Sequence, residues 1–300
     1  MPPTQLPIPG DSGIPGDAGA PEAFSPFAVP GEVSDPSSHE RALITPSIQE
    51  LMEFIRPYAA ALLAAGGQTS RVDRTAARIA HAYGYRVELI IFTRRFTLSI
   101  ARNSGAAVER RTAVCSCLPD SPNFQRVVAL NALSWAIANE HLPFYKARQE
   151  FAAICALPGF APQLLPPAVA VANAAFCGLF QGDLAAMGIV GCATFVAFSL
   201  RQKLLDLGLD LKLVTFVCAL LSSLIASLGV LLHWGDTPQI ALASSVLFLI
   251  PGMALINSTL DVLDGHILMG FARLVHASIL IVCIALGLSA TMLVLGVDAL

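Results

Sequence analysis

The sequence predicts an all-α membrane bundle of about five transmembrane helices, preceded by a small cytoplasmic α+β domain. Of the 300 residues, 55% are hydrophobic and only 13% are charged, whereas about 25% of a typical soluble domain is charged. The charged residues gather in the first half, and long apolar stretches fill the second half. A helix needs roughly 20 apolar residues to cross about 30 Å of hydrocarbon. These stretches lack the polar face of a water-exposed helix, so lipid is their expected surrounding.

The composition divides the chain into three regions. Residues 1–43 are rich in proline, glycine, serine and aspartate, and we expect this tail to be disordered because it has too little apolar surface to offset the entropy of folding. Residues 44–157 are the predicted α+β domain, and residues 158–300 are the predicted transmembrane domain. No cleavable signal peptide is expected, since the N-terminus lacks a basic segment followed by an apolar one.

The α+β domain is predicted from apolar spacing and from turn residues. Helical spacing predicts helices over about residues 47–65, 70–83, 123–138 and 143–154. Enrichment in valine, isoleucine, phenylalanine and threonine predicts strands over residues 86–92, 95–101 and 110–115. We expect Thr45 to cap the first helix, with Pro46 in its first turn, and Gly66-Gly67 to end it.

Five apolar segments are the predicted transmembrane helices, at about residues 162–180, 183–200, 213–233, 239–256 and 267–295. Pro251-Gly252 lies inside the fourth and indicates a broken helix, because freed backbone carbonyls are tolerated only beside protein or a water-lined cavity. The fifth segment is too long for one simple span. Its first ten residues are therefore expected at the membrane interface.

Basic residues predict the orientation in the membrane. Arg201, Lys203 and Lys212 crowd the connection between the second and third predicted helices, and positively charged connections usually stay in the cytoplasm. With the α+β domain in the cytoplasm, this connection falls inside and residues 233–238 fall outside. The expected location is the bacterial inner membrane, with a multi-pass chain and a cytoplasmic N-terminus.

Several classes of function are not expected. The net charge of -3 and the lack of a basic stripe argue against a nucleic-acid partner. The pair Cys115-x-Cys117 has the wrong spacing for a zinc or redox motif, so no metal and no cofactor are expected and the seven cysteines are predicted to be structural. The chain has no GxSxG, HExxH or P-loop motif, so we do not expect an enzyme.

Polar residues within the apolar half are candidates for a substrate or ion pathway. Asn257 and Asp261 follow the Pro251-Gly252 break and share a helix face, and an ionisable group inside a membrane usually marks a pathway. The alternative is that Asp261 is solvated at the cytoplasmic end of its helix. Asn173 lies in mid-helix, and either hydrogen bonds to a neighbouring helix or contact with substrate would satisfy it.

Two charged residues lie nearer the ends of the predicted helices. Asp183 follows a glycine between the first two helices and is either a turn residue or an outer gate. Arg273 could neutralise a substrate carboxylate, but extension of its side chain toward the lipid headgroups is the favoured interpretation.

The α+β domain offers its own candidate pocket. Four polar residues follow the Gly-Gly turn, and they could line a small regulatory or substrate-gating pocket: Gln68, Thr69, Arg71 and Asp73. The main alternative is a solvated helix face.

Three motifs, in this order, resemble those of the threonine/serine exporter family. Residues 62–73 (L-L-A-A-G-G-Q-T-S-R-V-D) resemble the stretch that opens its soluble domain, with Gln68 where the family often has Glu. Residues 128–134 (V-A-L-N-A-L-S) resemble a family helix. Residues 251–265 (P-G-M-A-L-I-N-S-T-L-D-V-L-D-G) resemble its most specific signature. The resemblance covers about residues 47–296.

The resemblance implies a bacterial inner-membrane exporter with a cytoplasmic N-terminal domain. Substrates of the family include threonine and serine and, in two-subunit relatives, a dicarboxylate such as succinate. This chain has about five predicted helices where full-length members have about ten. It therefore resembles the larger subunit of the split form, which implies a second small membrane subunit, a homo-oligomer, or both.

The expected function is export of a small polar metabolite by secondary active transport, through alternating access around the helix break. Cargo in such carriers often binds at broken helices near the membrane midplane. The alternative is a membrane-anchored sensor or hydrolase in which the α+β domain carries the activity.

Overall fold

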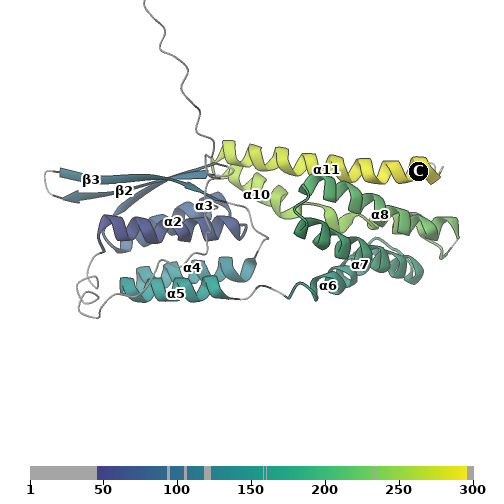
Figure 1. Ribbon diagram of the computed structural model, residues 1–300, viewed down its shortest axis with the longest axis horizontal. Coiled ribbons are helices and arrows are strands. Elements are labelled where there is room, and N and C mark those ends of the chain that lie inside the picture. The colour runs from purple at the N-terminus through teal and green to yellow at the C-terminus, as the bar shows by residue number, and fades with distance from the viewer. Residues whose placement is uncertain are drawn as a thin grey trace, which may run out of the picture.

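The computed structural model describes residues 46–92, 95–104, 107–117, 123–157, 159, 161–232 and 234–295. Two units lie end to end along the long axis of the molecule (Figure 1). The N-terminal unit, residues 46–157, combines a small sheet with helices, and the helical unit, residues 161–295, contains helices alone. The predicted tail, residues 1–43, lies outside the described residues.

The N-terminal unit has the predicted mixture of helices and strands. Its elements are α2 (Ile48–Ala64), α3 (Thr69–Ala82), β1 (Arg86–Ile91), β2 (Arg95–Ser104), β3 (Ala107–Ser116), α4 (Phe124–Asn139) and α5 (Phe144–Ala156). The strands form one antiparallel sheet in the order β1-β2-β3, with Leu98 opposite Leu89 on one side and Ala113 on the other. The third strand is longer than predicted, because its pairing with β2 extends the regular structure beyond the apolar residues.

The start of α2 corrects one prediction. Thr45 lies outside the described residues, and the N-cap is Ser47, whose hydroxyl oxygen accepts a hydrogen bond from the backbone of Glu50. The Glu50 carboxylate in turn accepts one from the backbone of Ser47 at 2.8 Å. This reciprocal arrangement is a capping box, which satisfies two amide groups that the helix cannot pair itself.

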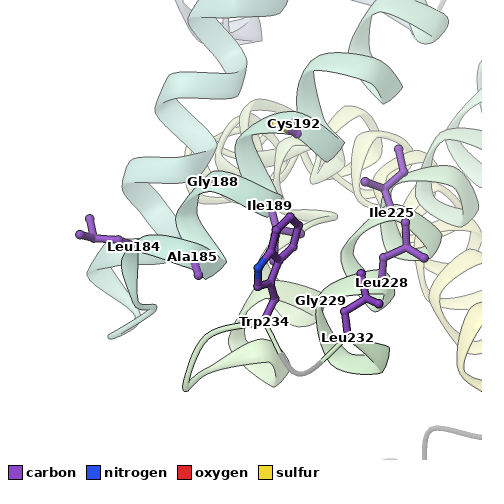
Figure 2. Close-up of a pocket in the computed structure, with 10 residues that line it drawn as sticks. All are labelled: Leu184, Ala185, Gly188, Ile189, Cys192, Ile225, Leu228, Gly229, Leu232 and Trp234. Carbon is purple, nitrogen blue, oxygen red and sulfur yellow. The ribbon is translucent and has the colours of Figure 1, made fainter.

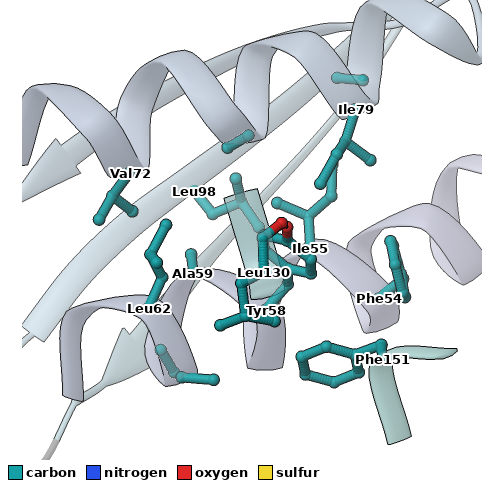
Figure 3. Close-up of a cluster of buried hydrophobic side chains, with 14 of the residues drawn as sticks. Phe54, Ile55, Tyr58, Ala59, Leu62, Val72, Ile79, Leu98, Leu130 and Phe151 are labelled. Atoms are coloured by element: carbon teal, nitrogen blue, oxygen red, sulfur yellow. The ribbon is translucent and has the colours of Figure 1, made fainter. Parts of the chain in front are cut away.

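Helix α2 lies at the centre of the N-terminal unit, between the sheet and the pair α4 and α5 (Figure 1). Its buried residues Ile55, Tyr58 and Leu62 meet residues of α3, β2 and α4, among them Leu98 and Leu130 (Figure 3). The Tyr58 hydroxyl donates to the backbone carbonyl of Leu130, so the buried polar group is satisfied.

The helical unit contains α6 (Leu165–Leu179), α7 (Leu184–Asp206), α8 (Leu211–Leu231), α9 (Pro238–Ser244), the 3₁₀ turn η1 (Leu247–Leu249), α10 (Gly252–Leu263) and α11 (Ile267–Leu295). Among the described residues, α7, α8 and α11 are long and apolar enough to cross a membrane, and the bent pair α9–η1 and α10 raises this to as many as four spans. Five spans are therefore not confirmed. Helix α6 has 15 residues, or about 22 Å at 1.5 Å per residue, which is short of the hydrocarbon thickness.

The predicted helix break is present. Ile250, which precedes Pro251, has an extended conformation with ψ 126°, as expected because a proline disfavours the helical conformation of the residue before it. The chain turns by 60° between the α9–η1 segment and α10. Helix α10 then continues to Leu263, beyond the predicted end at residue 256. Helix α11 is continuous over the whole predicted fifth segment.

Two glycines allow α11 to pack closely on its neighbours. A Cβ atom at Gly270 would lie 2.6 Å from a methyl group of Val262 in α10. A Cβ atom at Gly287 would lie 2.8 Å from the Cβ of Ala219 and 2.9 Å from the carbonyl oxygen of Phe216, both in α8. Helix α11 is thereby held against α10 near its start and against α8 further along.

Candidate functional site at the junction of the two units

The turn between α2 and α3 touches the helical unit at the hairpin formed by α10 and α11, where α3 approaches both helices (Figure 1). We call this contact the junction. It consists of four residues of the turn (Gly66, Gly67, Gln68 and Thr69) and four of the hairpin (Asn257, Asp261, Asp264 and Arg273). Residues that the sequence assigned to two separate sites therefore meet in one place.

Asp261 is the buried centre of the junction. Its side chain has no solvent exposure. Its Oδ1 accepts a hydrogen bond from the backbone amide of Thr69 at 3.0 Å, and its Oδ2 accepts one from the Thr69 hydroxyl at 3.0 Å. The Nη1 atom of Arg273 lies 3.0 Å from Oδ2. A buried carboxylate is costly unless it is both paired and hydrogen-bonded, and Asp261 meets both conditions.

Arg273 binds both partners of the junction. Its side chain is 15% exposed, and its Nη2 donates to the carbonyl oxygen of Gly67 at 3.3 Å. Its Nη1 atom forms the ion pair with Asp261, but the geometry is not that of a hydrogen bond. Among the described residues, Nη1 has no hydrogen-bond acceptor. The favoured interpretation, extension toward the lipid headgroups, is wrong, because Asp261 on the neighbouring helix holds the guanidinium.

Two amide side chains complete the junction. The Asn257 side chain donates to the carbonyl oxygen of Gly66 at 3.1 Å, and the Gln68 side chain donates to Asp264 at 2.8 Å. Asn257 and Asp261 do share one face of α10, and that face meets the turn. The alternative of a solvated Asp261 is wrong, because the turn buries it.

The Gly66-Gly67 turn shapes this contact. Gly66 has a φ of 87°, which favours glycine. A Cβ atom at Gly67 would lie 2.6 Å from the carbonyl oxygen of Leu62. The two glycines let the chain leave α2 sharply and present both of their carbonyl oxygens to Asn257 and Arg273.

The four candidates of the N-terminal unit do not form one pocket. Gln68 and Thr69 reach the hairpin, whereas Arg71 is exposed. Asp73 is half-buried, and this burial raises the pKa of its carboxyl, while the nearby His266 and Arg74 act in the opposite direction. Asp73 therefore faces the hairpin turn, and Arg71 fits the alternative of a solvated helix face.

Asn173 joins three elements of the helical unit. Its side chain is buried, and its amide donates to the Thr194 hydroxyl at 2.7 Å and to the carbonyl oxygen of Ser244 at 3.2 Å. These bonds connect α6 to α7 and α9. Of the two open interpretations, the geometry favours a link between helices.

Replacing Asn173 by alanine is expected to lower the stability of the helical unit by about 1 kcal/mol, since hydrogen bonds between membrane helices contribute roughly 0.6–2 kcal/mol. Thermal unfolding of the detergent-solubilised protein measures this as a lower midpoint. Ser199→Ala is the matched control, because the Ser199 hydroxyl bonds only the carbonyl of Phe195 in its own helix among the described contacts. An unchanged midpoint together with lost transport would instead make Asn173 a substrate contact.

Asp183 is the N-cap of α7, and the turn between α6 and α7 lies at the end of the helical unit that is remote from the N-terminal unit (Figure 1). Asp183 caps α7 by accepting from the amide of Ala186 at 2.9 Å, and it also accepts from the amide of Asp236 and the hydroxyl of Thr237. The hydrogen bond from Ala186 has the largest effect, and together these bonds lower the pKa of the Asp183 carboxyl. The residue thus ties the α6–α7 turn to the segment before α9, as a structural turn residue does.

An apolar groove of about 430 Å³ opens between α7 and α8 at this remote end (Figure 2). It is lined by Leu184, Ala185, Gly188, Ile189, Cys192, Ile225, Leu228, Gly229, Leu232 and Trp234. None of these side chains is charged, so the groove does not suit a small polar substrate. No pattern in the sequence indicated this groove.

A family model described as "Putative threonine/serine exporter" matches residues 53–295, a range that includes most of both units. The chain belongs to this exporter family. Two relatives carry the name "Probable succinate transporter subunit YjjP". The one from Escherichia coli K12 is 28% identical over 246 residues, which cover 78% of this chain and 91% of that protein. The one from Klebsiella aerogenes is 34% identical over 134 residues, or 44% of this chain and 52% of that protein. No solved structure matches the chain.

Membership of the exporter family confirms the resemblance drawn from the three motifs. It favours transport over the sensor or hydrolase alternative. The first and third motifs contain seven of the eight junction residues, and Arg273 lies beyond the third motif. In the structure the start of α3 has no capping side chain of its own segment, and Asp261 of the third motif bonds it instead. Because Thr69 and Ser70 are themselves common capping residues, no local pattern in the sequence indicated this distant partner.

Proposed function

We propose that the chain is one subunit of a bacterial exporter that moves a small carboxylate-bearing metabolite out of the cytoplasm. The candidate substrates are threonine- or serine-like amino acids and a dicarboxylate such as succinate. The observation that carries the proposal is the family match over residues 53–295, together with an E. coli relative, named as a succinate transporter subunit, that aligns over 91% of its length.

The broken helix supports a carrier mechanism. Carriers commonly bind cargo where helices are interrupted, because free backbone groups and helix ends can bind it there. The break at Pro251 and Gly252, with its 60° turn, is such an interruption within an apolar unit. In this proposal the break is the moving part of secondary active transport. Asn257, Asp261 and Arg273 form its cytoplasmic gate, and Asp183 lies at the opposite mouth.

We place the N-terminal unit in the cytoplasm. Arg201, Lys203 and Lys212 lie where α7 ends and α8 begins, on the side of the helical unit that faces the N-terminal unit (Figure 1). Positive charge favours the cytoplasmic side of a membrane. This arrangement supports an inner-membrane protein with the N-terminal unit and the basic α7–α8 connection both inside the cell.

A partner subunit completes the proposal. In the apolar 18-residue stretches of α7, α8 and α11, only 28%, 44% and 22% respectively is buried within this chain. Lipid can cover such surface, but a pathway for a polar metabolite needs protein or water on both sides. A second small membrane subunit, further copies of this chain, or both would supply the missing wall.

The test is reconstitution of the chain in liposomes, alone and with any small membrane protein found to be encoded beside it. We expect efflux of labelled succinate or threonine above that of empty liposomes when both proteins are present. The proposal fails if no pairing moves either substrate. It is replaced by the enzyme alternative if the detergent-solubilised chain instead chemically converts one of them.

A further inference from the structure

The junction carries an inference that rests on the proposed function and extends it. We propose that the junction is a releasable latch. Asp261 of α10 caps helix α3 across the two units, and through this contact the N-terminal unit holds the broken helix in one position until the latch opens during transport.

The start of α3 depends on Asp261. The N-cap residue is Gln68, and no side chain of the same segment bonds the free amides of the first turn. A carboxylate 192 residues further along the chain accepts from the Thr69 amide instead. A negative charge at a helix N-terminus is favourable because the amides there carry partial positive charge. Helix α2, by contrast, has its own capping box.

The contact between the units is polar. The buried apolar clusters of the described residues each stay within one unit: one within residues 48–155, the others within residues 177–288. What crosses the junction is hydrogen bonds, two from Thr69 and one each from Gln68, Asn257 and Arg273. Polar groups can exchange these partners for water, whereas separation of an apolar core exposes surface that water does not satisfy.

Each side keeps a partner when the latch opens. Asp261 and Arg273 both belong to the α10–α11 hairpin, so their ion pair survives departure of the N-terminal unit. The amides at the start of α3 would then bind water, as uncapped helix ends do. Neither state leaves a buried charge alone, which is what a reversible contact requires.

The latch is well placed to move the break. Helix α10 begins at Gly252, directly after Pro251, and Asp261 lies near its other end. The 12-residue helix therefore acts as a lever between the break and the junction. The close contact at Gly270 couples α11 to the same movement.

Reversible crosslinking tests the latch. Gln68→Cys with Asp264→Cys places two thiols at an exposed contact of the junction, in a Cys192→Ala background that removes the exposed native thiol. A short bifunctional methanethiosulfonate reagent joins the pair, and reductant releases it. We expect at least a tenfold loss of efflux in the crosslinked protein, and reduction should return efflux to the level of the same variant before crosslinking.

The control crosslink lies within the N-terminal unit. Ser99→Cys with Thr112→Cys joins two directly paired and exposed sheet positions, so its crosslink should leave efflux unchanged. The latch is overturned if the junction crosslink also leaves efflux unchanged. If efflux is absent from the parent chain and from both cysteine pairs in their reduced state, the result counts against the proposed function instead of the latch.

Hydrogen exchange gives a readout that does not need transport. Asp261→Ala should speed amide exchange at residues 69–72 by at least tenfold, because alanine has no oxygen to accept the hydrogen bond from the Thr69 amide. Residues 48–51, which follow the Ser47 capping box of α2, serve as the internal control and should not change. Equal exchange of residues 69–72 in both proteins would refute capping by Asp261.

Discussion

Asp261→Asn is expected to reduce efflux at least tenfold and to destabilise the protein strongly. The substitution keeps the size of the side chain but leaves Arg273, whose side chain is only 15% exposed, without its negative partner. Removing one member of a buried ion pair typically costs about 3–5 kcal/mol. Thermal unfolding in detergent and efflux from liposomes measure the two effects separately.

Two further variants separate charge from contact. Asp264→Asn is the matched control, because Asp264 is exposed and accepts only from Gln68 among the described contacts, so a small effect is expected. Adding Arg273→Gln to Asp261→Asn removes both charges and should restore part of the stability, as a double-mutant cycle would show. If Asp261→Asn unfolds at the wild-type temperature, the result would contradict a stabilising ion pair between Asp261 and Arg273.

Gly287→Ala is expected to destabilise the packing of α8 on α11 by about 1–3 kcal/mol, the usual cost of overpacking. The new Cβ would meet the backbone oxygen of Phe216 at 2.9 Å and the backbone nitrogen of Leu220 at 3.0 Å, and backbone atoms of a helix cannot rotate away. The two helices would have to separate. That movement would also strain the hydrogen bond between the hydroxyls of Ser223 and Thr291 at 2.6 Å.

Gly188→Ala is the matched control for this prediction. It lies in another long apolar helix, and a Cβ atom there would have no neighbour within 4 Å. Alanine favours a helix over glycine by about 1 kcal/mol, so Gly188→Ala should unfold at or above the wild-type temperature. Equal midpoints for the two alanine variants would mean that close packing at Gly287 does not limit stability.

Local patterns predicted most of the elements. The strands and the four helices of the N-terminal unit follow from apolar spacing and glycine turns, which act over a few residues. The break at Pro251 was predictable for the same reason, since the proline acts on the residue next to it. The length of α6 was overestimated because apolar composition continues past both of its ends, and only the chain's turns at Leu164 and Phe180 set its limits.

The junction could not be predicted to the same degree. The sequence named Thr69 as a candidate pocket residue and Asp261 as a candidate pathway residue, but it could not show that each satisfies the other, because they are far apart along the chain. The interpretation of Arg273 failed for this reason. Without a known partner, an arginine in an apolar helix suggests a side chain that extends to water. Pairing across helices is decided by tertiary packing.

The separate cores of the two units have a consequence for the design of chimeras. Because no apolar cluster among the described residues joins the N-terminal unit to the helical unit, grafting the N-terminal unit of a family relative onto the helical unit of this chain would require matching only a small set of contact positions. Such swaps would exchange the N-terminal unit between exporters of the family without redesign of the helical unit.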